Sequence, residues 1–546
     1  MPVKRFFVVL SVVLSAAFLV AAVGLAARQS APQGGLPGDA LLIGAPYEDI
    51  GSIANAGSFN VLYGVEGGNL DTTSSPLWIQ TNISDGVETD DNFAAALATG
   101  DFDGNGFVDA AVGVPGEDIE SWDGLQVIQD AGAVNIIYNS PVGLTDLDSQ
   151  FWEQSDTGVA ATEEGDAFGQ VLAVGDFNGD SFDDLAIGVP QEDVETAGGT
   201  ITDTGAVIVL YGAPGALSAN GSQLFTQQDL AAIGFSPQAY DYFGFALAAG
   251  DFNADGYDDL AIGVPLETQD AGSLDSAGAV AVLYGSRSNG LRVDGAQKWT
   301  QSGTGQGFSE SGDKFGRALT AGDFNGDGCD DLAIGAPYED IVADDAGAVN
   351  VLYCAADHAA GLSTAGSQVW WQSQITNGSG TAYSLSEEGD LFGLSLAAGD
   401  FDADGHDDLL IGVPYEDVGS ETSNGAAHIL FGSDSGTVTT NTFFWYDDGG
   451  DRFAAALAVG DFDRDGSDDF AAGVPGHEVN GAVSAGGVHV FYSRGSFPIL
   501  FPYDEVLTAA DIPGIAPEAG DWLGGALAVI PPGSPRPFIY LPLVIR

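Results

Sequence analysis

The stretch Asp400-Phe-Asp402-Ala-Asp404-Gly-His406-Asp-Asp408-Leu-Leu-Ile-Gly-Val-Pro414 decides how this chain folds. Aspartates stand at the first, third, fifth and ninth positions of its loop, a glycine stands at the sixth, and an apolar run follows. Oxygen ligands at such spacing converge on one hard cation, and the glycine permits the sharp turn between them. The stretch therefore predicts a calcium loop that leads directly into a β-strand.

Six copies of this loop recur along the chain, each followed by the same kind of apolar strand. Asn replaces Asp at some ligand positions, and Ser181 replaces the glycine of the second copy. The expected side-chain ligands are Asp101, Asp103, Asn105 and Asp109; Asp176, Asn178, Asp180 and Asp184; Asp251, Asn253, Asp255 and Asp259; Asp323, Asn325, Asp327 and Asp331; Asp400, Asp402, Asp404 and Asp408; and Asp461, Asp463, Asp465 and Asp469. The seventh residue of each loop is expected to add its backbone carbonyl, from Phe107, Phe182, Tyr257, Cys329, His406 and Ser467.

Three other interpretations of the loops are weaker. Asp and Gly also gather in ordinary turns, but six recurrences at one spacing favour a metal site. An EF-hand loop needs Glu at position 12 and a flanking helix. Position 12 is instead apolar and lies within a predicted strand, as Val112, Ile187, Ile262, Ile334, Ile411 or Ala472. Magnesium prefers fewer protein ligands and more water, so we expect about six Ca²⁺ sites.

Each loop is part of a longer repeat of four predicted strands. A segment with a central aromatic or leucine precedes the loop, and two β-rich runs and a weaker aromatic run follow it. The residues at the centre of the preceding segment are Phe93, Phe168, Phe243, Phe315, Phe392, Phe453 and Leu523. Short runs of Val, Ile, Leu, Tyr and Phe punctuated by Gly, Pro and Asp are typical of strands. Four strands repeated seven times predict an all-β, seven-bladed β-propeller of antiparallel blades.

The two ends of the repeat region complement each other. Residues 39–79 supply second, third and fourth strands without a first, and residues 521–530 supply a first strand alone. We expect these ends to share one blade, which closes the ring and leaves no open sheet edge. A linear solenoid is the alternative, and it would leave both half-repeats unpaired. The expected propeller domain covers residues 38–530.

The motifs around the loops resemble the FG-GAP repeats of integrin α-subunit propellers. Phe-Gly precedes most loops, and Gly-Ala-Pro follows as Gly44–Pro46 and Gly335–Pro337, with Gly-Val-Pro elsewhere. Phe93 and Phe453 depart from the pattern because Ala follows them, and Leu523 replaces Phe. The resemblance covers residues 39–530 and implies a calcium-binding propeller that meets its ligand on the face opposite the metal loops. Glu-Asp pairs such as Glu117-Asp118 fall on that face, where they form either a partner surface or acidic turns that cap strand ends.

The net charge and the sequences of the two chain ends indicate where the protein is located and which partners are unsuitable. The 546 residues include 13 basic and 79 acidic ones, for a formal net charge of -66. Such a charge repels nucleic acid and anionic membrane surfaces. Residues 1–30, with Lys4, Arg5 and an apolar run, are typical of a secretory signal peptide, or of an uncleaved N-terminal anchor. Residues 531–546 form a Pro-rich apolar tail that is too short to span a bilayer.

The two cysteines, Cys329 and Cys354, fall at adjacent ends of two strands of one repeat. A disulfide there suits an exported protein, and two unrelated small residues are the alternative. The five histidines have no zinc spacing, and neither cysteine has a local nucleophile signature. We therefore expect no enzyme activity.

The sequence predicts a secreted or cell-surface calcium-binding propeller for adhesion to, or recognition of, an extracellular protein or glycan. A polysaccharide-acting enzyme and a structural surface-layer component are the alternatives. We expect no nucleic-acid partner and no membrane insertion of the mature body, and the oligomeric state is left open.

Overall fold

The computed structural model describes residues 39–532, apart from 74, 84–85, 121–125, 270–272, 288, 357, 359, 377–381, 383, 418–421, 447–450, 496–502 and 513. The predicted signal segment 1–30 and residues 533–546 of the predicted tail lie outside the described residues.

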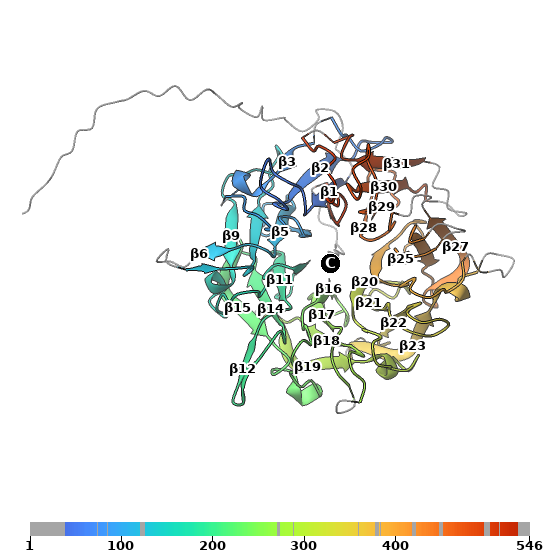
Figure 1. Cartoon of the computed structure of the whole chain (residues 1–546). Coiled ribbons are helices and arrows are strands. Elements are labelled where there is room, and N and C mark those ends of the chain that lie inside the picture. The colour runs from blue at the N-terminus through green and yellow to red at the C-terminus, as the bar shows by residue number, and fades with distance from the viewer. Residues whose placement is uncertain are drawn as a thin grey trace, which may run out of the picture.

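Seven four-stranded antiparallel sheets surround a central axis, which confirms the predicted seven-bladed propeller (Figure 1). Blade 1 contains β4 (Ala96–Gly100), β5 (Asp109–Val114), β8 (Ala133–Ile137) and β9 (Gln150–Glu153). Blade 2 contains β10 (Val171–Gly175), β11 (Asp184–Val189), β14 (Ala206–Tyr211) and β15 (Ser218–Phe225). Blade 3 contains β16 (Ala246–Gly250), β17 (Asp259–Val264), β18 (Ala279–Tyr284) and β19 (Arg292–Trp299).

The remaining blades follow the same order from the axis outward. Blade 4 contains β20 (Ala318–Gly322), β21 (Asp331–Ala336), β22 (Ala348–Cys354) and β23 (Leu362–Trp370). Blade 5 contains β24 (Ser395–Gly399), β25 (Asp408–Val413), β26 (Ala426–Phe431) and β27 (Val438–Tyr446). Blade 6 contains β28 (Leu457–Gly460), β29 (Asp469–Gly473), β30 (Gly487–Tyr492) and β31 (Tyr503–Thr508).

Smaller elements decorate the blades. Two hairpins extend from the second strands of blades 1 and 2, formed by β6 (Ile119–Glu120) with β7 (Val127–Ile128) and by β12 (Val194–Thr196) with β13 (Gly199–Ile201). Five 3-10 turns follow fourth strands: η1 (Gln80–Asn82), η2 (Gln154–Thr157), η3 (Ala231–Ile233), η4 (Gln301–Thr304) and η5 (Gln372–Gln374). No helix among the described residues is long and apolar enough to cross a membrane.

Blade 7 joins the two ends of the propeller, as the half-repeats predicted. It contains β32 (Ala526–Ile530), β1 (Ala40–Ala45), β2 (Ser58–Tyr63) and β3 (Leu77–Trp78). β32 pairs with β1 in antiparallel register, from Ala40 opposite Ile530 to Gly44 opposite Ala526. Because this pairing closes the ring, the solenoid alternative is excluded.

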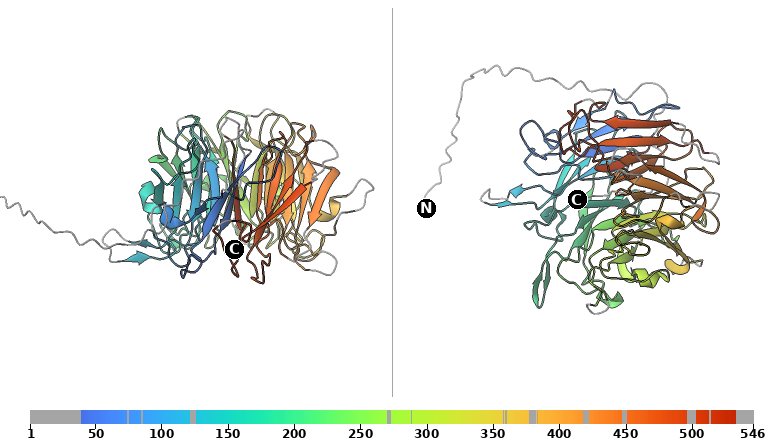
Figure 2. Two further views of the ribbon diagram at one scale, coloured as in Figure 1. Left: turned by 90° about the horizontal axis from the view of Figure 1, so that it is seen from above. Right: turned by 45° about the vertical axis from the view of Figure 1, so that its right-hand side comes forward.

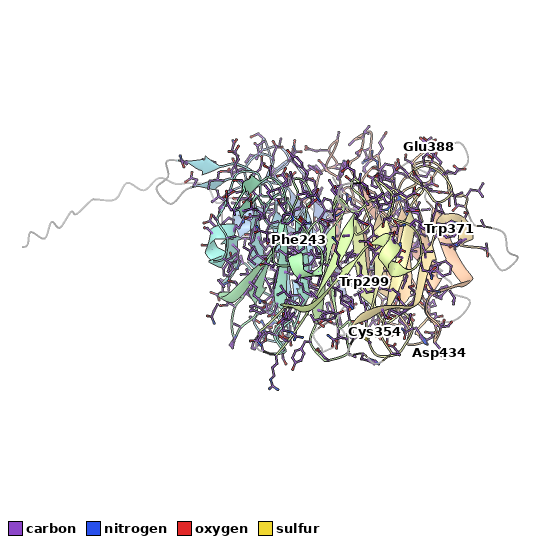
Figure 3. All side chains as sticks on the ribbon, turned by 90° about the horizontal axis from the view of Figure 1, so that it is seen from below. Phe243, Trp299, Cys354, Trp371, Glu388 and Asp434 are labelled. Carbon is purple, nitrogen blue, oxygen red and sulfur yellow. A yellow bond between two sulfur atoms is a disulfide. The ribbon has the colours of Figure 1, made fainter. Side chains whose placement is uncertain are left out.

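The core lies between neighbouring blades. One apolar cluster joins Val207 and Val209 of blade 2 to Phe243 and Leu260 of blade 3, and six similar clusters occupy the other boundaries. Phe243 is fully buried and is labelled within the stack in Figure 3. The propeller is therefore held together by the surfaces through which one blade contacts the next.

The Phe-Gly and Gly-Val-Pro motifs meet at these boundaries. A Cβ atom on Gly113 of blade 1 would lie 2.1 Å from the carbonyl oxygen of Gly169 in blade 2. Gly169 itself has φ of +89°. Only glycine allows both this close backbone approach and this dihedral, which explains why the two motifs recur together.

The strands run between two different faces of the ring (Figure 2). Each metal loop connects the first strand of a blade to the second, so the six loops lie on one face, called here the metal-loop face. The Phe-Gly segments and the turns after Gly-Val-Pro lie on the opposite face. In Figure 3, Cys354 and Asp434 lie toward the metal-loop face and Glu388 toward the opposite face.

Candidate metal centres

Backbone amides orient the side chains of each metal loop. In the fifth loop, the N–H groups of Asp404 and Gly405 donate to the two carboxylate oxygens of Asp400 at 3.0 and 2.9 Å. The N–H of His406 donates to Asp404 at 3.0 Å. The sixth loop has the same three bonds, from Asp465, Gly466 and Ser467. The recurring turn thus fixes the first and fifth aspartates beside each other.

Three loops bring carboxylates together closely enough to share one cation. One ligand atom from each of three aspartates lies within 4.8 Å of the others in the sets Asp101, Asp103 and Asp109; Asp400, Asp402 and Asp404; and Asp461, Asp463 and Asp465. In the first and fifth loops, Oδ1 of Asp101 and Oδ1 of Asp402 are buried and have no hydrogen-bond donor among the described residues. Clustered carboxylates with unsatisfied oxygens fit a calcium ion.

The second, third and fourth loops differ because Asn occupies their third position. In these loops the amide N–H of the Asn side chain donates to the carboxylate of the ninth residue. The bond runs from Asn178 to Asp184 and from Asn253 to Asp259, both at 3.2 Å. Asn325 and Asp331 make the same contact. These loops hold one fewer carboxylate than the fifth and sixth.

The ninth residue ties each loop to the third strand of its blade. Asp408 accepts hydrogen bonds from Gly432 N–H, just beyond β26, at 2.8 Å and from Phe401 N–H at 3.0 Å. Burial raises the pKa of Asp408 to about 9 and that of Asp109 to about 8. An ionised carboxylate in this position therefore needs a nearby positive charge, which a bound cation would provide. The assignment of the ninth residue as a ligand stays a prediction.

The eighth residue links each loop to the neighbouring blade, which the sequence did not reveal. Asp323 N–H donates to the carboxylate of Asp407 at 2.9 Å, and Asp407 N–H donates to the carbonyl of Asp323 at 3.0 Å. This reciprocal pair recurs between Asp183 and Asp101, Asp258 and Asp176, Asp330 and Asp251, Asp468 and Asp400, and Asp39 and Asp461. We call these six contacts the inter-blade aspartate pairs.

One exception explains the pattern of these pairs. The first loop has Val108 at its eighth position, and its neighbour is blade 7, which has no metal loop. Val108 packs instead in an apolar cluster with Ala528 and Ile530 of that blade. Aspartate at the eighth position is therefore present where a neighbouring loop needs an acceptor.

The fourth loop carries a covalent link. Cys329 and Cys354 form a disulfide with a Cα–Cα distance of 6.1 Å, which confirms the pairing interpretation of the two cysteines. The bond joins the seventh residue of the loop to the end of β22. Cys354 N–H also donates to the carboxylate of Asp331 at 2.9 Å. A covalent bond and a hydrogen bond therefore both connect this loop to the end of β22.

The ring of His406 contacts two acids at the fifth loop. Its Nδ1 lies 2.9 Å from the carboxylate of Asp404, and its Nε2 lies 3.2 Å from that of Asp434. The hydrogen bond with Asp404 raises the pKa of the imidazole. The sequence assigned only a carbonyl to this residue, so the ring contact is an addition.

On the opposite face, the two acids of each Glu-Asp pair have different roles. Glu339 and Glu416 are each only 4% exposed, and each accepts a hydrogen bond from a buried glutamine, Gln301 or Gln372. The second acid caps a turn, as where Asp340 accepts from Asp345 N–H at 2.8 Å. Asp49, Asp118, Asp193 and Asp417 cap turns in the same way. In these pairs the glutamate is buried and the aspartate caps a turn, so the contacts support the interpretation as acidic turns.

Comparison with known proteins agrees with this architecture. The FG-GAP repeat family matches residues 93–136, 168–210, 243–283, 315–352, 392–430 and 453–491. The chain is an FG-GAP repeat protein. Each matched segment of this FG-GAP protein begins at a Phe, which Gly follows in four segments and Ala in two, and contains one complete metal loop.

Two sequence relatives and one solved structure were found to be similar to this FG-GAP protein. It is 33% identical over 261 residues to integrin alpha pat-2 of Caenorhabditis briggsae, covering 45% of this chain and 18% of the integrin. It is 31% identical over 194 residues to phosphatidylinositol-glycan-specific phospholipase D of Bos taurus, covering 36% of this chain and 21% of that protein. The chain thus matches about a fifth of each relative's length. A rhamnogalacturonan lyase of Bacillus licheniformis aligns with a TM-score of 0.34 at 12% identity, over 80% of this chain and 68% of the lyase, and this weak likeness carries no argument.

Proposed function

We propose that this protein is an extracellular calcium-binding propeller that recognises a partner and has no catalytic activity of its own. The observation that carries the proposal is the convergence of carboxylates, with unsatisfied buried oxygens, in loops of one repeated geometry. The similarity to integrin α subunits supports a role in recognition. Calcium would bind each loop through its aspartates, asparagines and one backbone carbonyl.

The energetics favour a cation in each loop. Two carboxylates about 4 Å apart repel each other by about 4 kcal/mol at the effective dielectric constant of a protein surface. Loops with three or four carboxylates contain several such contacts. A divalent cation converts this repulsion into attraction, and the inter-blade aspartate pairs would pass the resulting order to the neighbouring blade.

An extracellular location is consistent with these features. Millimolar calcium outside cells can saturate modest sites, and a disulfide such as Cys329–Cys354 persists in an oxidising compartment. The high negative charge keeps such a protein away from nucleic acid and anionic lipid. A partner would therefore meet it as a protein or glycan at the cell exterior.

Calcium stoichiometry tests the proposal directly. Equilibrium dialysis of the purified protein followed by elemental analysis should find about six Ca²⁺ per chain. Replacing Asp400, Asp402 and Asp404 together by Asn should remove about one, whereas Glu388→Gln, at an exposed acid of the opposite face, should remove none. Finding no stoichiometric calcium, or an equal loss in both variants, would overturn it.

A further inference from the structure

The three cations nearest the axis of the opposite face lie among aromatic rings. We define the axial cluster as Phe245, Lys314, Arg317, Tyr338, Tyr415 and Arg452. Phe245 and Arg317 directly precede the first strands β16 and β20, which lie closest to the axis in Figure 1. Tyr338 and Tyr415 follow the prolines that end the second strands of blades 4 and 5. Residues from four blades thus meet around the axis.

Rings and cations are in direct contact within the axial cluster. The Arg317 guanidinium lies 4.1 Å from the centre of the Phe245 ring. The Lys314 ammonium lies 3.5 Å from the centre of the Tyr338 ring. Arg452 lies 5.4 Å from Tyr415 and 5.9 Å from Trp522 of blade 7. Cation–π contacts of this kind hold the charged groups in place but do not neutralise them.

The cations of the axial cluster have no acidic partner. Among the described residues, none of the side chains of Lys314, Arg317 and Arg452 makes an ion pair or a hydrogen bond. Lys298 behaves differently, because it pairs with Glu267 at 2.6 Å. In a chain with 79 acidic and 13 basic residues, three neighbouring cations without a carboxylate are unexpected, since acids are available nearly everywhere else.

Burial makes this arrangement unfavourable unless something binds there. Burial lowers the pKa of Arg317 to about 10. Burial and then the charge of Arg317 lower the pKa of Lys314, while the smaller effect of the charge of Asp345 opposes this. Two like charges held together in a half-buried place favour an anion between them.

The surroundings limit what kind of anion fits. Exposed carboxylates lie on the same face and are called here the acidic rim; they stand in the segments that lead to first strands or connect second to third strands: Asp90, Asp130, Glu163, Glu310, Glu387 and Glu518. A polyanionic glycan carries a charge on every sugar and would be repelled by this acidic rim. The better complement is a segment that carries one carboxylate, apolar residues next to it and basic groups further along. The carboxylate would match the axial cluster, and the basic groups would match the acidic rim.

We propose that the axial cluster binds one carboxylate that a partner protein presents on an apolar segment. This inference rests on the recognition function proposed above and names the chemistry of its contact point. Arg317 would pair with the carboxylate, Lys314 and Arg452 would add charge at either side, and the rings of Phe245 and Tyr415 would pack against the apolar neighbours. Arginine and aromatic residues are the groups that dominate the energy of protein interfaces.

Two matched small probes test the chemistry on the full, calcium-loaded protein. N-acetylphenylalanine carries a carboxylate beside an aromatic ring, and N-acetylphenylalaninamide differs only in lacking the charge. Titration calorimetry should show that the carboxylate binds about tenfold more tightly, as expected for a charge-assisted contact with a guanidinium. Arg317→Gln should abolish the preference, and Arg317→Lys should retain part of it. Arg287→Gln should leave it intact, because Arg287 is exposed beside the metal-loop face.

Stability separates a binding role from a structural one. Arg317→Gln removes a half-buried cation that has no acidic partner, so its melting temperature should equal or exceed that of the parent protein. A clear fall would show that Arg317 holds the blades together, and would overturn the proposal. Equal affinity for the two probes, or a preference that survives in Arg317→Gln, would overturn it as well.

Two further measurements define the partner class. Trigalacturonic acid that binds more tightly than N-acetylphenylalanine and displaces it would replace the protein partner by an acidic glycan and so refute the inference. Calcium stoichiometry, measured on the same samples, keeps the two proposals apart. Six bound ions with no probe preference would refute the axial site alone, and absent calcium would refute the proposed function.

Discussion

The two faces of the propeller both bury carboxyl groups in repeated positions, but they balance the charge in different ways. On the metal-loop face, aspartates converge within each blade and accept backbone N–H groups, leaving oxygens that suit a cation. On the opposite face, a buried glutamate faces a buried aspartate, as Glu416 faces Asp390, and receives one glutamine amide. The arrangement on the metal-loop face favours ionised carboxylates together with a metal ion. The arrangement on the opposite face favours the protonated form of the buried glutamate.

Blades 3 and 6 show a third way of balancing charge on the opposite face. In blade 3, Lys298 forms an ion pair with Glu267 at 2.6 Å. In blade 6, His477 lies 2.6 Å from Asp451 in the position that a glutamate occupies elsewhere. A basic side chain thus contacts the buried acid in each of these two blades. The comparison teaches that burying an acid is tolerated once a metal, a proton or a basic group compensates it.

Removing calcium should give the largest effect and should act on the metal-loop face alone. Each site stabilises the folded state by about 2.7 kcal/mol at a calcium concentration one hundred times its dissociation constant. Several sites together should therefore lower the melting temperature by about 10 °C or more in excess chelator. Differential scanning calorimetry measures this, and readdition of Ca²⁺, but not Mg²⁺, should restore it. An unchanged melt in chelator would remove the distinction between the faces.

The inter-blade aspartate pairs should give the next largest effect. Asp407→Ala leaves the partly buried N–H of Asp323 without its acceptor, and the loss should fall at the lower end of the range of about 1–3 kcal/mol for an unsatisfied buried donor. Asp407→Asn keeps an acceptor oxygen and should lose much less. Denaturant unfolding in saturating calcium compares the free energies of unfolding of the alanine and asparagine variants. Val108→Ala is the control, because it measures the loss of packing at the boundary between blades 7 and 1, which has no aspartate pair. Equal losses in the alanine and asparagine variants would show that charge, and not the hydrogen bond, matters at this position.

The protonated carboxyls of the opposite face predict a pH dependence of stability. Burial and the charge of Asp390 raise the pKa of Glu416 to about 8 from its ordinary value near 4.5. The folded state therefore holds a proton that the unfolded state releases, so stability is fully present below about pH 4.5 and falls as the pH rises through about 8. In chelator, the melting temperature should consequently be higher at pH 5 than at pH 8.

A substitution at Glu416 sharpens this test. Glu416→Gln mimics the protonated form and should raise the melting temperature by about 1 °C at pH 8, which corresponds to about 1 kcal/mol in a domain of this size, and change little at pH 5. Glu388→Gln is the control, because Glu388 is an exposed acid of the same blade and face. A gain of equal size at both pH values would mean that the glutamate is buried as an anion.

The fold could be predicted from the sequence because the repeat is strict and the two ends of the repeat region are complementary. The half-repeats at residues 39–79 and 521–530 predicted the closing blade, and loop spacing predicted the aspartates that gather in the first, fifth and sixth loops. Asp39 could not be recognised, because it lies outside any loop and meets Asp461 only when the ring closes. The sequence left open whether the Glu-Asp pairs form a partner surface or acidic turns, and it did not indicate that Glu117 is only 1% exposed.

The axial cluster was equally invisible in the sequence. Arg317 and Phe245 occupy the same repeat position in adjacent blades, where Ala95 and Gln170 stand in two others. No spacing rule relates an arginine in one repeat to a phenylalanine in the previous one. Their contact arises from the geometry of the ring, which places equivalent positions of all blades around one axis.

The smallest expected effect distinguishes loops within the metal-loop face. The fifth loop has four carboxylates at its ligand positions, whereas the fourth loop has Asn325 at its third position and therefore only three. Because calcium affinity rises with ligand charge, Asp402→Asn should weaken the fifth site about threefold to tenfold, and Asn325→Asp should strengthen the fourth by a similar factor. Calcium titration of each variant measures the change, with little effect on melting in saturating calcium. If both substitutions weakened binding, ligand geometry and not charge would rank the loops, because Asn325 would then be placed to offer its amide oxygen to the ion.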